Sequence, residues 1–113
     1  MMENYSFGRI VIAGTAYTSD LKIINGKVIS HWWRKAGHAV EQDDIVDILA
    51  VKPHVVIIGQ GNPGMMRVTA ELKDELGRLG IALIEEPTAK AVATFNRLFD
   101  AGKNIAAGFH LTC

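Results

Sequence analysis

The sequence predicts an α/β fold: a three-layer single domain over residues 1–113, in which a mixed central sheet carries an N-terminal β-hairpin layer followed by a βαβαβ unit. Three observations lead to this prediction. Short β-branched runs fill the first third of the chain, helical periodicity begins near residue 41, and apolar runs then alternate with amphipathic segments up to residue 109. A chain of 113 residues has the usual size of one domain, and no repeat or linker divides it.

The first third is expected to form β structure. Arg9–Ile12 and Leu21–Ile24 are short runs rich in β-branched residues. Asn25–Gly26 follows the second run and is typical of a type I′ turn, which needs two positive φ angles. We therefore predict a hairpin here, and its second strand is expected to continue through Trp33 and to end by Gly37.

The remaining two thirds are expected to alternate helices with strands. Helices are predicted where apolar residues recur every three or four positions, and buried strands where nearly every residue is apolar. Such alternation places helices on a largely parallel sheet through right-handed crossovers. The expected elements are a short helix from Glu41 to Pro53, a strand over 54–58, a helix with Thr69 as N-cap and Gly80 as its end, a strand over 81–84, a helix opened by Pro87-Thr88 and ended by Gly102, and a strand over 105–109.

Composition restricts the partners and the location. The 12 basic and 12 acidic residues cancel, so no field gathers polyanions and no nucleic-acid partner is expected. The longest strongly apolar run, Val55–Ile58, is far shorter than the roughly 20 residues that cross a bilayer, so we expect no membrane insertion. The single cysteine, Cys113, cannot form an internal disulfide, and no signal-peptide pattern opens the chain; both favour a cytoplasmic location.

A glycine-rich loop follows the expected strand over 54–58. Gly59, Gly61 and Gly64 match the pattern G-x-G-x-x-G, which in dinucleotide-binding domains runs straight into a helix. Here Pro63 removes an amide, the first N-cap comes only at Thr69, and too little chain remains for a complete cofactor domain. We therefore predict no cofactor, and the main interpretation is that the glycines let the backbone turn sharply at the end of a central strand.

The same loop suggests an alternative. The carboxyl ends of parallel strands border a crevice, and Arg67 would lie near it, before a helix N-terminus. Gly61, Arg67 and Glu86 are therefore candidates for a site that binds a small anion or a small metabolite. Glu85 and Glu86 also suggest acid–base catalysis, although paired glutamates at a strand end are usually only solvated.

Trp32 and Trp33 allow two interpretations. Neighbouring residues of a strand point to opposite faces, so each indole can pack into its own layer, with Arg34 and Lys35 solvated beyond. The other interpretation is an exposed indole flanked by Arg34 and Lys35, a composition enriched in protein interfaces.

Other catalytic and metal signatures are sparse. His110 and Cys113 have close ligand spacing, but a single H-x-x-C is weak evidence for a metal, and a terminal strand with an ordinary histidine and a free thiol explains it. The sequence has no G-x-S-x-G, no Walker lysine loop and no H-E-x-x-H. We therefore predict no metal site and no catalytic residue.

Several local signatures occur together along the chain. They are Tyr5–Ile10, Trp32–Lys35 with Gly37-His38, Val56–Gly61, Met66–Val68, Pro87–Val92 and Ala107–Cys113. This set resembles the small single-domain family that includes the adipogenesis-associated Mth-domain protein, the mitochondrial NADH dehydrogenase (complex I) alpha-subcomplex assembly factor 3, and many uncharacterised bacterial and archaeal proteins. The resemblance covers almost the whole chain and is closest to the free-standing prokaryotic type. It implies a three-layer fold with an assembly or regulatory role and no agreed reaction, which makes an enzyme less expected.

The leading hypothesis is a non-catalytic interaction or assembly-type protein with an unknown protein partner. Its expected surface combines the Trp33-Arg34 strand with the loop from Gly59 to Arg67. The alternative hypothesis is the small-ligand binder or enzyme described above. The candidate binding residues are Trp33, Arg34, Gly59, Gly61, Gly64, Arg67, Glu86 and His110.

Overall fold

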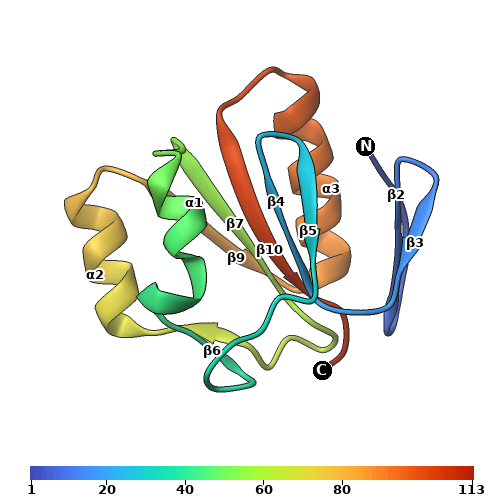
Figure 1. Ribbon diagram of the computed structural model, residues 1–113, viewed down its shortest axis with the longest axis horizontal. Helices are drawn as coiled ribbons and strands as arrows, with labels where there is room; N and C mark the ends of the chain where they lie inside the picture. Colours follow the sequence, from blue (N-terminus) through green and yellow to red (C-terminus); the bar gives the residue numbers. More distant parts are fainter.

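A five-stranded mixed sheet runs through the middle of the computed structural model, which describes residues 1–113 (Figure 1). The strand order is β5 (Lys27–Ser30), β4 (Leu21–Ile24), β10 (Ile105–His110), β7 (Val55–Gln60) and β9 (Ala82–Glu86). β10, β7 and β9 are parallel, whereas β4 lies antiparallel to both β10 and β5. The predicted mixed α/β sheet is thereby confirmed.

Helices cover both faces of this sheet (Figure 1). α3 (Thr88–Asp100) lies on one face, and α1 (Val46–Ala50) and α2 (Ala70–Arg78) lie on the other. A 3₁₀ turn, η1 (Gln42–Ile45), leads into α1. None of the helices, the longest of which has 13 residues, combines the length and the apolar character that a membrane span needs.

Two smaller sheets complete the molecule. β1 (Met2–Ser6), β2 (Arg9–Ile12) and β3 (Thr15–Tyr17) form an antiparallel sheet that packs beside α3 as an N-terminal β layer. Of these three strands the sequence had indicated only β2. The hairpin predicted at Asn25–Gly26 is β4–β5 and belongs to the central sheet instead. The second sheet pairs β6 (Ala39–Val40) with β8 (Arg67–Val68) in parallel, and so brings two loops together that lie far apart in sequence.

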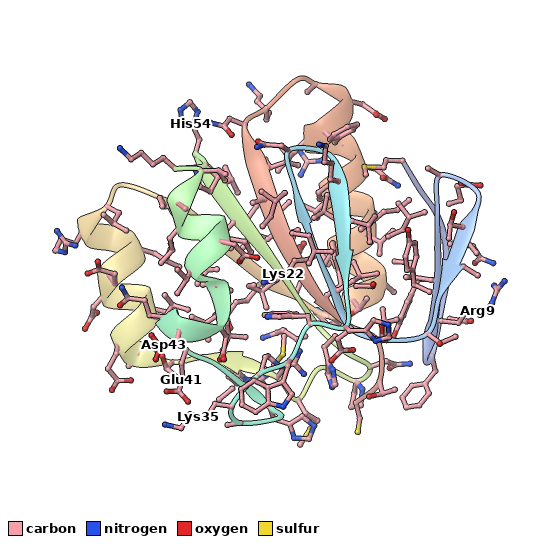
Figure 2. All side chains as sticks on the ribbon, in the orientation of Figure 1. Arg9, Lys22, Lys35, Glu41, Asp43 and His54 are labelled. Atoms are coloured by element: carbon pink, nitrogen blue, oxygen red, sulfur yellow. The ribbon has the colours of Figure 1, made fainter.

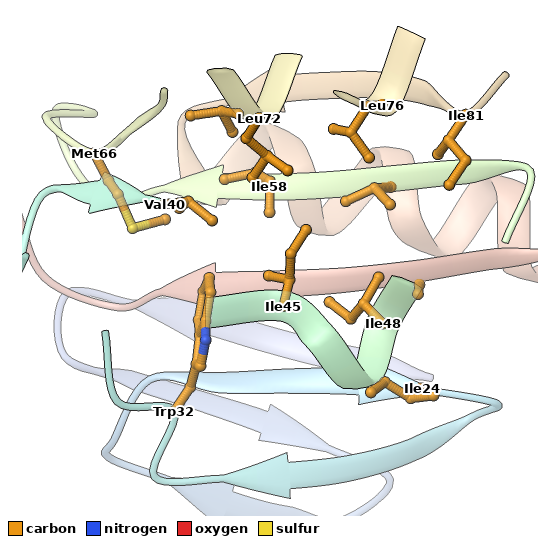
Figure 3. Close-up of a cluster of buried hydrophobic side chains, with 13 residues drawn as sticks. Ile24, Trp32, Val40, Ile45, Ile48, Ile58, Met66, Leu72, Leu76 and Ile81 are labelled. Atoms are coloured by element: carbon orange, nitrogen blue, oxygen red, sulfur yellow. The ribbon is translucent and has the colours of Figure 1, made fainter. Parts of the chain in front are cut away.

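Alternation along the central strands creates two cores. Val56 and Ile58 of β7 point towards α1 and α2, where they meet Ile45, Ile48 and Leu72 (Figure 3). Ile57, which lies between them, and Phe109 of β10 face α3 and the β1–β3 sheet. All six residues of β10 are buried, as expected for a strand covered on both faces.

Local signals located most elements. Asn25 and Gly26 have φ angles of 52° and 75°, which confirms the type I′ turn between β4 and β5. The Thr69 hydroxyl accepts a hydrogen bond from the Leu72 amide at 3.2 Å and caps α2, as predicted. β9 begins one residue later than expected and extends to Glu86.

The prediction of a tryptophan-bearing strand is wrong. β5 ends at Ser30, and His31 has a φ of 58°, in the left-handed region, which breaks the extended run. Residues 31–38 form a loop that returns to the sheet, where the Trp32 amide donates to the Asp20 carbonyl at 2.8 Å. The side chains of Trp32 and Trp33 point in different directions because of this loop, and not because neighbouring residues of a strand alternate between its faces.

Candidate functional site

The carboxyl ends of β7, β9 and β10 meet at one edge of the sheet. Because these strands are parallel, the residues that follow them come together there. Figure 1 shows the C-terminus at this edge, beside the loop that follows β7 and the turn between β1 and β2. Loop 31–38 reaches the same edge because the Arg67 amide donates to the His38 carbonyl at 2.9 Å.

A buried ionic cluster of Asp20, Arg34 and His110 lies under this edge. Arg34 Nη2 and His110 Nδ1 both lie 2.8 Å from Asp20 Oδ2, and the Leu111 amide donates to Asp20 Oδ1 at 2.8 Å. Only 5% of the Arg34 side chain and 8% of the His110 side chain are exposed. The prediction of a solvated Arg34 is therefore wrong, because Asp20 lies where it can neutralise the guanidinium.

The environment of Asp20 shifts the pKa values of two groups, Asp20 itself and Tyr5. Burial acts to raise the pKa of Asp20, but the hydrogen bonds from His110, the Leu111 amide and Arg34 outweigh it and hold this pKa below its usual value. Burial, together with the nearby Asp20 charge, raises the pKa of Tyr5, whose hydroxyl donates to the Leu111 carbonyl at 2.9 Å. Asp20 therefore stays ionised, and Tyr5 stays protonated, at neutral pH.

The His110 ring is held through its Nδ1 atom. Because Asp20 is ionised and can only accept, Nδ1 of His110 is assigned as the donor of the hydrogen bond between them. His110 Nε2 and Arg34 Nη1 are buried and have no hydrogen-bond partner in the protein. The His38 ring packs edge-on against His110, with centroids 5.6 Å apart. An aspartate that orients a histidine is also found in catalytic sites, but here Nε2 is closed in by protein.

The glycine loop is held by its neighbours. Gly61 has a φ of 94°, and a Cβ at this position would collide with the Thr112 carbonyl oxygen and lie 2.7 Å from His110 Cδ2. The Gly61 amide donates to Thr88 Oγ1 at 2.8 Å, and this hydroxyl donates to the His110 carbonyl at 2.6 Å. Gly61 thus turns the chain at a point where the end of β10 and the residues after it lie close to the Gly61 backbone. This is the structural role predicted for the loop.

The space in front of Gly61 is filled in this structure. The Asn62 and Met65 amides donate to the carbonyls of Thr112 and Cys113, at 2.8 and 3.1 Å, so the last residues cover the loop. The loop then enters β8, not a helix, and Arg67 donates to the carbonyls of its own loop. The two cavities of the molecule lie elsewhere, one beside Thr69 and one beside Leu79. Binding of an anion at this loop stays a prediction.

The two glutamates at the end of β9 are engaged and not merely solvated. Glu85 accepts a hydrogen bond from the Val68 amide at 2.9 Å and pairs with Lys73. Glu86 accepts a hydrogen bond from Thr94 at 2.6 Å and lies 3.5 Å from Lys90, on the α3 side of the sheet. Both carboxylates connect elements of the fold, and Glu86 stands apart from the Arg34 cluster. No group of three or more histidine, cysteine or acidic side chains gathers in a metal-binding arrangement.

Exposed apolar side chains surround the same edge. Trp33 is 76% exposed, Phe7 59% and Met65 54%. Phe7 lies in the turn whose Gly8 amide donates to the Leu111 carbonyl at 2.8 Å, and Met65 lies in the loop tied to Cys113, so both flank the C-terminal residues. Trp33 precedes Arg34, which reaches His110. We call Phe7, Trp33 and Met65 the apolar face.

The structure brings most of the predicted site residues to one edge of the sheet, although they play different parts. Arg34 and His110 belong to the buried cluster. A Cβ at Gly59 would lie within 3.0 Å of Phe109 and Thr88, and only Trp33 and Arg67 present side chains to solvent. Sequence reasoning missed Asp20 and Phe7. No local signal marks Asp20, which stands alone between two apolar runs. An apolar residue at a tight turn before Gly8 is a signal that could have pointed to Phe7.

A family model, described as a protein of unknown function (DUF498/DUF598), matches residues 2–110. The chain belongs to this family. No curated protein matches it in sequence at a significant level. The family's fold recurs in solved structures, including a conserved hypothetical protein from Pyrococcus horikoshii OT3, with a TM-score of 0.85 and 24% identity over 100% of this chain and 99% of that chain.

Two further structures extend the comparison. A protein recorded as MT938 is 28% identical, has a TM-score of 0.80, and covers 100% of this chain and 98% of its own. A Bordetella pertussis protein described as an Mth938-like domain is 16% identical, with a TM-score of 0.71 over 97% of this chain and 84% of that chain. The structural neighbours of the chain thus include an Mth938-like domain, and the link to a respiratory assembly factor stays a prediction.

Proposed function

We propose that this domain is a non-catalytic protein-interaction module of the assembly type, and that it docks through the apolar face. The observation that carries the proposal is Trp33. An indole with 76% of its surface exposed is unusual in a soluble domain, and tryptophan is among the residues most enriched at the energetic centres of interfaces. The resemblance to a complex I assembly factor supports the same class of function.

The surroundings of Trp33 strengthen this argument. The residues on either side of it, Trp32 and Arg34, are buried, so the loop cannot turn the indole inward without breaking the core. Phe7 and Met65 are also exposed, on segments at the same edge of the sheet, and methionine adapts readily to a partner. A rigid loop that already presents its aromatic anchor lowers the entropic cost of association.

Quantitative affinity capture tests the proposal. The variant Trp33→Ala removes the central anchor, and we expect it to lose at least about tenfold of the specifically captured partner, which corresponds to the roughly 1.4 kcal/mol or more typical of such a residue. Leu79→Ala is the matched control, because Leu79 is 45% exposed but lies at the opposite edge, where β9 begins. Unchanged capture of every specific partner by Trp33→Ala, with both variants folded, would contradict the proposal.

A further inference from the structure

A small cavity opens at the amino edge of the parallel strands, where the segments that follow α1 and α2 lead into β7 and β9. Its volume is about 250 Å³. Leu49, Leu79 and Ile81 supply its apolar lining. Ile81 is buried, whereas Leu79 is 45% exposed. The cavity therefore has an apolar wall that is open to solvent.

Two basic side chains and no acidic one line the same cavity. They belong to Lys52 and His54, and neither residue takes part in an ion pair of the protein. Their backbone is held in place, because the Lys52 amide donates to the Leu49 carbonyl at 3.1 Å and the His54 amide donates to the Asn104 carbonyl at 2.9 Å. Figure 2 shows His54 on the opposite side of the molecule from Lys35. The fold thus positions an ammonium group and an imidazole beside apolar walls.

We propose that this cavity binds a small carboxylate that carries an apolar chain. The carboxylate would accept hydrogen bonds from Lys52 and His54, and the chain would cover Leu49 and Leu79. A volume of about 250 Å³ lies just below the range of about 300–1,000 Å³ that is common for drug-sized ligands, so the cavity suits a small metabolite. The site lies at the opposite edge from Trp33 and does not depend on the proposed function.

The lining favours this class of ligand over a cation or an inorganic anion. A cation would meet the Lys52 ammonium, and an inorganic anion would leave the apolar walls exposed to water. α2 ends at this cavity, and the end of a helix also favours a basic side chain. Its last turn is already satisfied, however, because the Gly80 and Ile81 amides donate to the Gly77 and Leu76 carbonyls at 3.1 and 2.9 Å. The two basic side chains are therefore available to a ligand.

Three related probes test this inference. Hexanoate carries both the carboxylate and the chain, acetate carries the carboxylate alone, and hexylamine carries the chain with the opposite charge. We expect hexanoate to bind the full chain at least about tenfold more tightly than either of the other probes, because only hexanoate matches both the basic side chains and the apolar walls. Nuclear magnetic resonance titrations measure the affinities, and the largest amide shifts should occur at Gly80 and Ile81.

A double variant, Lys52→Gln with His54→Gln, removes the two basic side chains. We expect it to weaken hexanoate binding at least about tenfold and not to weaken hexylamine binding. Lys103→Gln is the matched control. Lys103 is exposed, forms no ion pair and precedes β10 at the same edge, but it does not line the cavity. Its substitution should leave the affinity for hexanoate unchanged.

Each other outcome overturns the inference. Equal binding of hexanoate and hexylamine, or an equal loss of hexanoate binding in Lys103→Gln, would mean that Lys52 and His54 do not select the ligand. Acetate binding as tightly as hexanoate would mean that the apolar walls contribute nothing. Hexanoate shifts that map beside Thr69 would place the ligand in the other cavity, and the absence of any shift would mean that no site exists. None of these results affects the proposal for Trp33, which affinity capture tests separately.

Discussion

Three consecutive residues show how the chain holds one exposed side chain in place. Trp32 donates its indole N–H to the Asp44 carbonyl at 2.9 Å and packs against Gly108, where a Cβ would lie 2.6 Å from the ring. Arg34 places its guanidinium 4.6 Å from the centroid of the Trp32 ring and pairs with Asp20. Trp33 between them has no such contacts to turn it inward. Its exposure therefore follows from the burial of its two neighbours.

At Gly61 we expect alanine to destabilise the protein strongly. The residue has a positive φ, and a Cβ would collide with the backbone oxygen of Thr112, which cannot yield as a flexible side chain can. We expect Gly61→Ala to lower the free energy of unfolding by roughly 2 kcal/mol or more, measured by urea denaturation.

Gly77 is the matched control for Gly61. It lies within α2, and a Cβ there would meet nothing within 4 Å. Gly77→Ala should therefore stabilise the protein by about 0.5–1 kcal/mol. A Gly61→Ala variant as stable as the original chain would show that the last residues do not cover the loop in solution.

At the scale of elements, Arg34 anchors loop 31–38. Its guanidinium bonds Asp20 in front of β4 and, at 2.9 Å, the Gly37 carbonyl within the loop. Arg34→Ala leaves Asp20 without this cation. We expect a loss of roughly 3 kcal/mol, at the low end for a broken buried ion pair because 19% of Asp20 remains exposed. Amide hydrogen exchange in loop 31–38 should rise beyond the global change.

An exposed arginine provides the comparison for Arg34. Arg97 lies on α3 and forms no ion pair, so Arg97→Ala should change the free energy of unfolding by about 0.5 kcal/mol or less. Equal effects of the two substitutions would mean that the Arg34–Asp20 pair does not hold the loop.

Elements that depend on local signals could be predicted from the sequence. The turn at Asn25–Gly26, the cap at Thr69 and the buried strand β7 depend on neighbouring residues, and the structure contains all three. The break at His31 could not be predicted, because a positive φ at a residue other than glycine has no reliable local signature.

The site was harder to predict because its partners are distant in sequence. Arg34 and His110 were both identified as candidates, but Arg34 was expected on the surface. Its burial depends on Asp20, 14 positions earlier, and on His110, 76 positions later, and only the topology brings the three together. The register of β10 against β4 and β7 places His110 beside Asp20 and Gly61. No local pattern contains that information.

At the scale of the whole molecule, Asp20 connects three parts of the fold. It follows the β1–β3 layer and precedes β4, it pairs with loop 31–38 through Arg34, and it holds the end of β10 through His110 and the Leu111 amide. Its ionisation should therefore affect the stability of the whole domain and not that of one loop alone.

Acid titration tests this role. In the folded protein the pKa of Asp20 lies below its usual value. When the pH falls below that usual value, the unfolded chain therefore binds more protons at Asp20 than the folded chain does. The stabilisation that Asp20 provides is complete above the unfolded pKa of about 3.9 and is lost as the pH falls through the folded pKa. Urea denaturation between about pH 7 and pH 2 should show this decline in the free energy of unfolding.

Asp20→Asn should lower the free energy of unfolding at neutral pH and flatten its decline in acid. Asp43→Asn, at an exposed carboxylate without a hydrogen-bond partner, should do neither. If Asp20→Asn has the same acid dependence as the unmodified chain, another carboxylate controls acid unfolding, and the cluster does not tie the three parts together.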